Sequence, residues 1–230
     1  MPERHLLLTC EHGGNRVPTA YRPLFAGRQA LLRTHRGWDG GALRVAKGLA
    51  QRLRVPLFSA TTSRLLVDLN RSPHNPAVFS EFTQSLPPEL RERLLRRYHT
   101  PHWEHVRRAI RANRGVTLHV GVHSFTPVWK GAPRAFPIGI LYDTRRARER
   151  AVAIAWQRRL REHLPTRAVR RNAPYRGGND GLTTALRREL RADRYLGIEI
   201  ELNQGVLEDP RRRRELVALL AESLAKVWPV

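Results

Sequence analysis

Short apolar stretches alternate with longer amphipathic stretches along most of the chain. This alternation is typical of an α/β domain, in which helices cover a sheet of buried strands. The apolar runs predict strands at His5–Cys10, Pro56–Ala60, Arg64–Leu69, Val116–His123, Pro137–Tyr142 and Tyr195–Leu202. Apolar residues at helical spacing predict helices at Ala42–Leu53, about Pro87–Asn113 with an interruption at Pro101, about Arg145–Leu164, Gly181–Leu190 and Pro210–Val227.

Length and composition limit the class of protein further. The chain has 230 residues, 41% of them hydrophobic, which suits one domain that buries its core without disulfides. No repeat or linker divides it, so we expect a single domain over residues 1–230. The single cysteine, Cys10, fits a reducing compartment, and no apolar run is long enough to cross a bilayer. Since the N-terminus also lacks a signal-peptide pattern, we expect a cytoplasmic protein.

The charge balance is unusual, because 42 Lys and Arg residues face 20 Asp and Glu residues, for a net charge of +22. All but three of these cations are arginines. A basic chain suggests a nucleic-acid partner, but such proteins usually concentrate their charge in a tail or a stripe. Here the arginines are spread from Arg4 to Arg214. This spread counts against a nucleic-acid partner and agrees better with a small anionic substrate.

Polar residues follow the predicted strands at four separate points of the chain. They are His12, Asn70–Arg71, His123–Ser124 and Glu201–Asn203. In open α/β sheets ligands bind at the carboxyl ends of the strands. The sequence therefore predicts a functional site at this edge of the sheet.

His12 and His123 are the natural candidates for metal ligands, because neutral imidazole suits zinc. Gly13 and Gly14 beside His12 allow a ligand to approach closely. A catalytic zinc usually takes a third protein ligand, commonly a carboxylate, and either Glu11 or Asp39 would supply it. Glu11 is adjacent to His12 and is expected to point the other way, whereas Asp39 precedes a predicted helix and is also a candidate N-cap. Both alternatives remain open.

Glu201 is the candidate general base. In the apolar strand that contains it, alternation places Glu199 and Glu201 on one face and the aliphatic side chains on the other. A carboxylate in a central strand is costly unless it is paired or functional. The alternative is an edge strand whose face is solvated or paired with arginines.

Five residues are candidates for substrate contacts. Arg71 offers a planar fork for a carboxylate, and Asn70 adds an amide donor. Tyr175 and Arg176 lie in a turn-rich loop that either closes over a substrate or is a plain connection. Ser124 directly follows His123 at the end of a predicted strand.

Together these features resemble the N-formylglutamate amidohydrolase family. The resemblance rests on Cys10–Asn15, Ser63–Arg71, Gly121–Ser124 and Gly197–Asn203, with further blocks at Trp38–Ala42, Ile138–Asp143 and Asn172–Gly177. It implies the fold of zinc carboxypeptidases and aspartoacylase-like hydrolases (phosphorylase/hydrolase-like), a mixed, mostly parallel sheet flanked by helices. It also implies one zinc per chain and hydrolysis of N-formyl-L-glutamate to formate and glutamate in histidine degradation.

By this resemblance, His12, Asp39 and His123 would hold the zinc, and Glu201 would act as general base. Asn70 and Arg71 would bind a substrate carboxylate. The carboxypeptidase-like ligand pair would need Glu at position 15, where this chain has Asn15, so the choice between Asp39 and Glu11 stays open.

Two other functions remain alternatives. Glu11 and Val122 precede the two histidines where founding members of the family carry other residues, which suggests a different acyl substrate. Another zinc amidase or peptidase, acting on a different acidic N-acyl amino acid or on a cell-wall peptide, is therefore one alternative. The other is a basic nucleic-acid-binding protein on an inactive hydrolase scaffold. The sequence predicts no oligomeric state.

Overall fold

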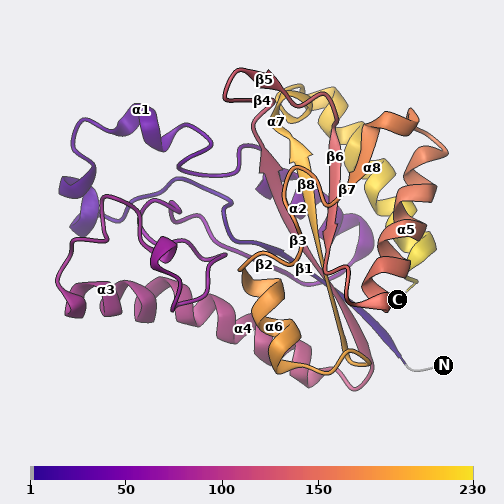
Figure 1. The fold of residues 1–230 in the computed structure, drawn as a ribbon, viewed down its shortest axis with the longest axis horizontal. Coiled ribbons are helices and arrows are strands. Elements are labelled where there is room, and N and C mark those ends of the chain that lie inside the picture. The colour runs from indigo at the N-terminus through magenta and orange to yellow at the C-terminus, as the bar shows by residue number, and fades with distance from the viewer. Residues whose placement is uncertain (1–2, 230) are drawn as a thin grey trace.

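The protein is built around a six-stranded sheet with the strand order β2-β1-β3-β8-β6-β7 (Figure 1). The computed structural model describes residues 3–229. The strands are β1 (Arg4–Cys10), β2 (Leu57–Ser59), β3 (Val116–Phe125), β6 (Ile138–Tyr142), β7 (Val169–Arg171) and β8 (Tyr195–Asn203). β2, β1, β3 and β8 run parallel, whereas β6 pairs antiparallel with β8 and parallel with β7. The predicted single α/β domain with a mixed, mostly parallel sheet is confirmed.

Helices cover both faces of the sheet. One face packs against α2 (Ala42–Leu53), α5 (Ala147–Arg161) and α8 (Pro210–Val227), and α8 also contacts both of the other helices. The other face packs against α4 (Thr100–Ala112) and α6 (Leu182–Glu189). The apolar side chains on the two faces of the sheet form separate clusters, and the strands contribute residues to both clusters. α2 and α8 match their predicted bounds because an apolar stripe defines each helix.

An irregular lobe lies beside the sheet, at the left of Figure 1. We define the lobe as residues 15–41 and 60–99. It contains α1 (Gln29–Leu32), α3 (Pro88–Leu94) and the 3-10 helices Thr19–Phe25 and Pro76–Val78, and it has its own apolar cluster. The lobe is held mainly by turns and by this cluster rather than by a sheet.

The predicted strand at Arg64–Leu69 is wrong. This apolar run forms consecutive turns in the lobe, and the amide of Leu66 donates to the carbonyl of Ser63 at 2.9 Å. Its apolar side chains are buried against other parts of the lobe, which explains why its composition resembled that of a buried strand. Asn70 and Arg71 therefore follow a turn and not a strand end.

The predicted interruption at Pro101 takes the form of a π-helical segment and not of a break. α3 continues into this segment, Leu95–His99, which leads directly into α4. Pro101 is the second residue of α4 and follows the π-helical segment, where the regular α-helical hydrogen bonding is already disturbed.

The remaining elements are small. A two-stranded hairpin, β4 (Val128–Trp129) with β5 (Ala132–Pro133), follows β3 and forms a small sheet of its own. α7 (Gln204–Leu207) follows β8, and a 3-10 helix covers Thr166–Ala168. Within residues 3–229, none of the helices combines the length and the apolar character needed to span a membrane.

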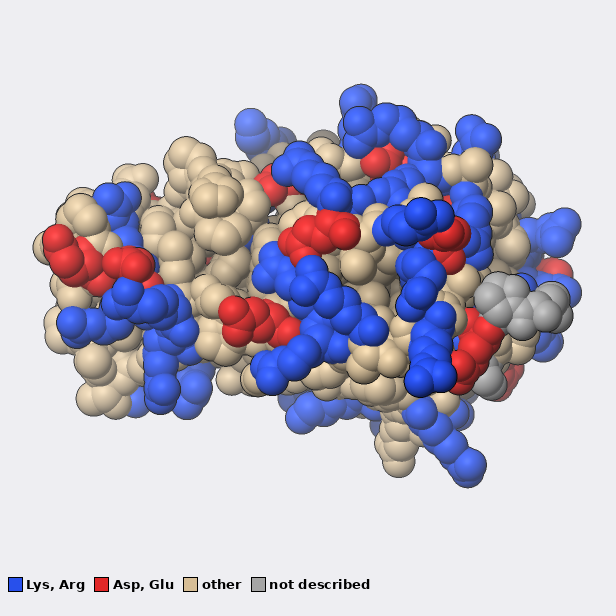
Figure 2. Space-filling view, turned by 90° about the horizontal axis from the view of Figure 1, so that it is seen from below, with Lys and Arg blue, Asp and Glu red and all other residues tan. Residues whose placement is uncertain are grey.

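Figure 2 shows one face of the molecule, on which arginines and lysines are spread among carboxylates and uncharged side chains. Elsewhere in the described structure ion pairs neutralise single cations. Arg107 contacts Glu189 at 2.7 Å, and Arg191 contacts Asp193 at 2.9 Å. The positive charge is therefore spread over the face in Figure 2, and ion pairs offset part of the charge of the molecule.

Candidate active site

The carboxyl ends of β1, β3 and β8 border a cavity of about 310 Å³, and the lobe closes it from the side. All the site residues selected from the sequence line it: His12, Asp39, Asn70, Arg71, His123, Ser124, Tyr175, Arg176 and Glu201. They come from segments that are far apart along the chain. The structure brings these residues together around one cavity, and their individual roles remain predictions.

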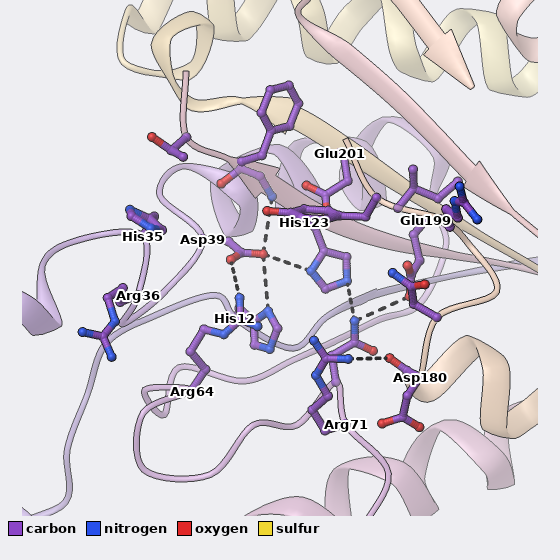
Figure 3. A pocket seen from close by; sticks show the side chains of 18 of the residues that line it. His12, His35, Arg36, Asp39, Arg64, Arg71, His123, Asp180, Glu199 and Glu201 are labelled. Atoms are coloured by element: carbon purple, nitrogen blue, oxygen red, sulfur yellow. Dashed lines mark hydrogen bonds and ion pairs between the residues drawn. The ribbon is translucent and has the colours of Figure 1, made fainter. Parts of the chain in front are cut away.

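His12, Asp39 and His123 form a compact, buried group at the base of this cavity (Figure 3). One ligand atom from each residue lies within 4.8 Å of the others. Asp39 Oδ2 lies 3.0 Å from His123 Nδ1 and 3.4 Å from His12 Nδ1. Two imidazoles and a carboxylate are the protein ligands of many catalytic zinc sites.

A second buried carboxylate lies against the Nε2 atom of each imidazole, on the side away from Asp39. His12 Nε2 donates to Asp68 Oδ1 at 2.7 Å, and His123 Nε2 lies 3.2 Å from Glu11 Oε2. With a hydrogen on Nε2, the Nδ1 atom of each ring faces Asp39 and would offer its lone pair to a metal ion that displaces any proton held there. His12 Nδ1 is buried without a hydrogen-bond partner. This group therefore fits a metal ion, and its outer carboxylates orient the rings as metal-bound histidines require.

The same geometry separates the two candidate carboxylates. Glu11 lies behind His123, where it also contacts His102 at 3.4 Å, and it is outside the compact group. Asp39 completes that group. Asp39 does not cap α2, because Gly41 occupies the N-cap position without any side-chain cap. Glu11 thus lies outside the group, as the alternation of neighbouring side chains predicts.

The turn that carries Asp39 is fixed to the sheet by its backbone. The amide of Asp39 donates to the carbonyl of His12 at 2.9 Å. Gly41 has a φ of 83°, a left-handed conformation that favours glycine, and a Cβ there would lie 2.8 Å from Leu207. Ser124 Oγ donates to the carbonyl of Gly40 at 2.9 Å, so Ser124 holds this turn although it also lines the cavity.

The charged residues of this group shift one another's pKa values. Burial and Arg64 lower the pKa of His12, but Asp68 and Asp39 together raise it above its ordinary value. Burial also lowers the pKa of His123, whose contacts with Asp39 and Glu11 raise it to well above the usual range. Burial raises the pKa of Asp39, but the two imidazoles hold it far below its usual range. Without a metal, protons therefore occupy the imidazoles, and a bound cation would have to displace them.

Glu201 lies beside His123 across the sheet, because the two residues are register partners on the parallel strands β8 and β3. Its side chain is buried, and Oε2 has no hydrogen-bond partner. Burial raises the pKa of Glu201 to about 8; the charge of His123 lowers it, while Asp39 and Glu199 raise it. A buried carboxyl group with a free oxygen, next to residues that fit a metal ion, is suited to proton transfer.

Arg64 and Asp68 belong to the site but were not selected from the sequence. Arg64 contacts Asp68 at 2.9 Å and Asp39 at 3.5 Å, and it lines the cavity. Asp68 is buried, and burial raises its pKa whereas Arg64 and His12 lower it to far below its usual range. The available signal was an acidic residue inside the apolar run Leu65–Leu69, since a buried carboxylate needs partners.

Asn70 and Arg71 lie side by side at one wall of the cavity. The Asn70 side chain accepts a hydrogen bond from the amide of Leu182 at 2.9 Å, and its amide nitrogen lies 3.5 Å from His123 Nε2. Asn70 therefore tethers the lobe to α6. Arg71 donates to the carbonyl of Asp180 at 3.2 Å (Figure 3), and His99 at the end of the π-helical segment donates to the carbonyl of Arg71 at 2.7 Å.

The loop with Tyr175 and Arg176 is anchored at both ends. Asn172 Oδ1 accepts hydrogen bonds from the amides of Tyr142 at 3.0 Å and of Gly177 at 3.1 Å. The buried Arg187 also donates to the carbonyl of Gly177 at 2.6 Å. The loop thus presents Tyr175 and Arg176 to the cavity from a fixed base.

Comparisons with known proteins support a hydrolase. A family model described as N-formylglutamate amidohydrolase matches residues 4–207, and no curated protein matches the chain. The structure of gene product Atu2144 from Agrobacterium tumefaciens has a TM-score of 0.81 at 28% identity, covering 98% of this chain and 91% of that one.

Two further solved structures are more distant. A metallo-carboxypeptidase from Burkholderia cenocepacia has a TM-score of 0.47 at 10% identity and covers 98% of this chain and 57% of that one. The amidase AmiC2 of Nostoc punctiforme, an N-acetylmuramoyl-L-alanine amidase, has a TM-score of 0.44 at 13% identity and covers 96% of each chain. Because the family model spans most of the sequence, the chain belongs to the N-formylglutamate amidohydrolase family, a family of amide-cleaving hydrolases.

Proposed function

We propose that the protein is a zinc-dependent amidohydrolase that cleaves the amide bond of an N-acyl amino acid. N-formyl-L-glutamate, giving formate and glutamate, is the first substrate to test, because the chain belongs to the family of that name. The observation that carries the proposal is the group of His12, Asp39 and His123, whose unpartnered His12 Nδ1 lies in a cavity with Glu201.

His12 Nδ1, Asp39 Oδ2 and His123 Nδ1 are the atoms that would hold one zinc ion. A zinc ion held this way supplies Lewis acidity, which polarises a carbonyl and makes water more acidic. Asp68 and Glu11 keep the imidazoles in the tautomer that presents Nδ1.

Glu201 is the proposed general base. Its pKa is raised by burial to about 8, and a cation at the neighbouring group would favour the ionised form. Glu201 then accepts a proton from the attacking water on its free Oε2 and delivers a proton to the leaving nitrogen. Arg64 lines the same cavity, where its positive charge would stabilise negative charge that develops on the carbonyl oxygen.

Arg71 is the proposed clamp for the carboxylate of the amino acid, with Arg176 as a second cation on the facing loop. The Arg71 side chain has a backbone carbonyl partner and no carboxylate partner within ion-pair distance in the described structure. It therefore has donors left for a substrate. Asn70, Ser124 and Tyr175 line the cavity and would shape it around the substrate.

The test is hydrolysis by the zinc-loaded protein of N-formyl-L-glutamate, N-acetyl-L-glutamate and a muramyl-type peptide, followed by release of the free amine. Hydrolysis of the formyl compound, lost in Glu201→Gln, would support the proposal. Cleavage of the peptide alone would favour the cell-wall alternative. No hydrolysis of any of them by a folded, zinc-loaded protein would contradict the proposal. The cytoplasmic location and a place in histidine degradation remain predictions.

A further inference from the structure

The hairpin β4–β5 leaves large apolar side chains uncovered at the mouth of the cavity. Its turn residues Lys130 and Gly131 have φ values of 49° and 79°, as a tight two-residue hairpin requires. Val128 is 51% exposed and Trp129 is 44% exposed. Most of the large apolar residues that are exposed in the described structure gather near this mouth, since Tyr175, 41% exposed, also lines the cavity.

Trp129 is held in place although it is exposed. Its indole meets the ring of His35 edge to face with the centroids 5.8 Å apart, and both residues line the cavity. The guanidinium of Arg134 lies 5.1 Å from the Trp129 ring and 5.5 Å from the Tyr175 ring. Arg134 therefore bridges Trp129 of the hairpin and Tyr175 of the loop that also lines the cavity. The hairpin thus presents a preorganised aromatic surface rather than a loose one.

Trp129 lies on a different side of the metal group from Arg71. Figure 3 shows His35 to the left of Asp39 and Arg71 below His123. Because Trp129 packs against His35, it belongs to the His35 side. If Arg71 binds the carboxylate of the amino acid, the acyl group on the other end of the amide extends toward Trp129.

A formyl group has a single carbon, so it would leave this aromatic surface in contact with water. A flat apolar acyl group would cover it and would gain both apolar burial and ring stacking. We propose that Trp129 is a specificity-determining residue that binds a flat apolar acyl group, so that the enzyme takes N-aroyl amino acids as well as N-formyl ones. This inference rests on the proposed amidohydrolase function and identifies a class of substrate for it.

The test compares N-benzoyl-L-glutamate with N-formyl-L-glutamate as substrates of the zinc-loaded protein. In Trp129→Ala, the ratio of kcat/KM for the benzoyl compound to that for the formyl compound should fall about tenfold. Trp129→Phe keeps a flat ring and should retain most of the ratio. Ile154→Ala removes another exposed apolar side chain, 43% exposed on α5, and should leave the ratio unchanged.

A binding measurement keeps this inference separate from the proposed function. Calorimetric titration of N-benzoyl-L-glutamate into zinc-loaded Glu201→Gln protein needs no turnover, and adding Trp129→Ala should weaken the Kd about tenfold. If neither compound is hydrolysed by the wild type, the proposed function fails, and this titration still decides the role of Trp129. An unchanged Kd, or an unchanged ratio in Trp129→Ala, would overturn the inference.

Discussion

The sheet and the lobe hold their parts of the candidate site by different means. Glu201 and His123 stand on neighbouring parallel strands in fixed register, and most residues of both strands are buried. Their positions are set by the backbone ladder of the sheet. A conservative substitution at such a position should change the chemistry of the side chain without moving its neighbours.

The lobe places its residues through individual hydrogen bonds. Asp68 accepts hydrogen bonds from His12, from Arg64 and from the amide of Asn70 at 2.9 Å. Trp103 of α4 donates to the carbonyl of Leu69 at 2.7 Å. Apart from Asp39 and Arg64, which have roles in the chemistry, a substitution in the lobe should therefore act by displacing a partner and should affect binding more than the chemical step.

Glu201→Gln tests the sheet side and should have the largest effect. The amide is nearly the same size but cannot accept the proton, so kcat should fall by roughly 10² to 10⁴. Zinc content should stay that of the wild type. A variant that keeps its activity would show that Glu201 is not the base.

Arg71→Ala tests the lobe side. Loss of a charged contact to the substrate carboxylate should raise KM roughly tenfold to a hundredfold while kcat changes little. Steady-state kinetics with N-formyl-L-glutamate measure both quantities. A loss confined to kcat would contradict the clamp role and would remove the distinction between the two regions.

Asp68→Asn and Glu11→Gln form a matched pair, because each carboxylate lies against the Nε2 atom of one imidazole, at 2.7 Å and 3.2 Å respectively. Asp68 lies in the lobe, and Glu11 follows β1 directly. Each variant should weaken zinc affinity about 10-fold to 100-fold, measured by competition with a chelator. Unchanged affinity in both would contradict the assignment of these carboxylates as orienting partners.

His119 lies in the sheet outside the metal group, and its substitution should affect the stability of the fold and not the activity. It is buried on β3 between Thr9 and Tyr195, each 2.8 Å from a ring nitrogen. Burial lowers the pKa of His119 to about 4, below its ordinary value.

Between about pH 6.5 and pH 4, His119 therefore binds a proton in the unfolded chain but stays neutral in the folded chain. The contribution of neutral His119 to the free energy of unfolding is complete above pH 6.5. It should fall, by up to about 3 kcal/mol, as the pH drops through this window. Denaturant unfolding at several pH values measures it, and His119→Gln should flatten the dependence relative to the wild type. An equal slope in both proteins would contradict this pKa.

The regular layers could be predicted from the sequence because periodicity determines which faces are buried. The runs at His5–Cys10 and Val116–His123 became β1 and β3, and α2 has the predicted bounds. Periodicity does not distinguish a buried strand from buried turns, which is why Arg64–Leu69 was misassigned. The hairpin with Trp129 was missed because its strands have two residues each.

The candidate site was found through the chemistry of strand ends, and its supporting contacts were not. His12, His123 and Glu201 follow or end strands, as expected. Asp68 and Arg64 depend on how the lobe folds back on the sheet, which local patterns do not encode. Long-range hydrogen bonds of this kind come from tertiary structure alone.

The most direct test of this account is the metal content of the purified protein, measured by mass spectrometry. About one zinc per chain is expected in the wild type and none in His12→Ala/His123→Ala. His35→Ala, which removes a cavity histidine outside the compact group, should keep its zinc. A folded wild-type protein that takes up no zinc, or a double variant that retains it, would contradict the account.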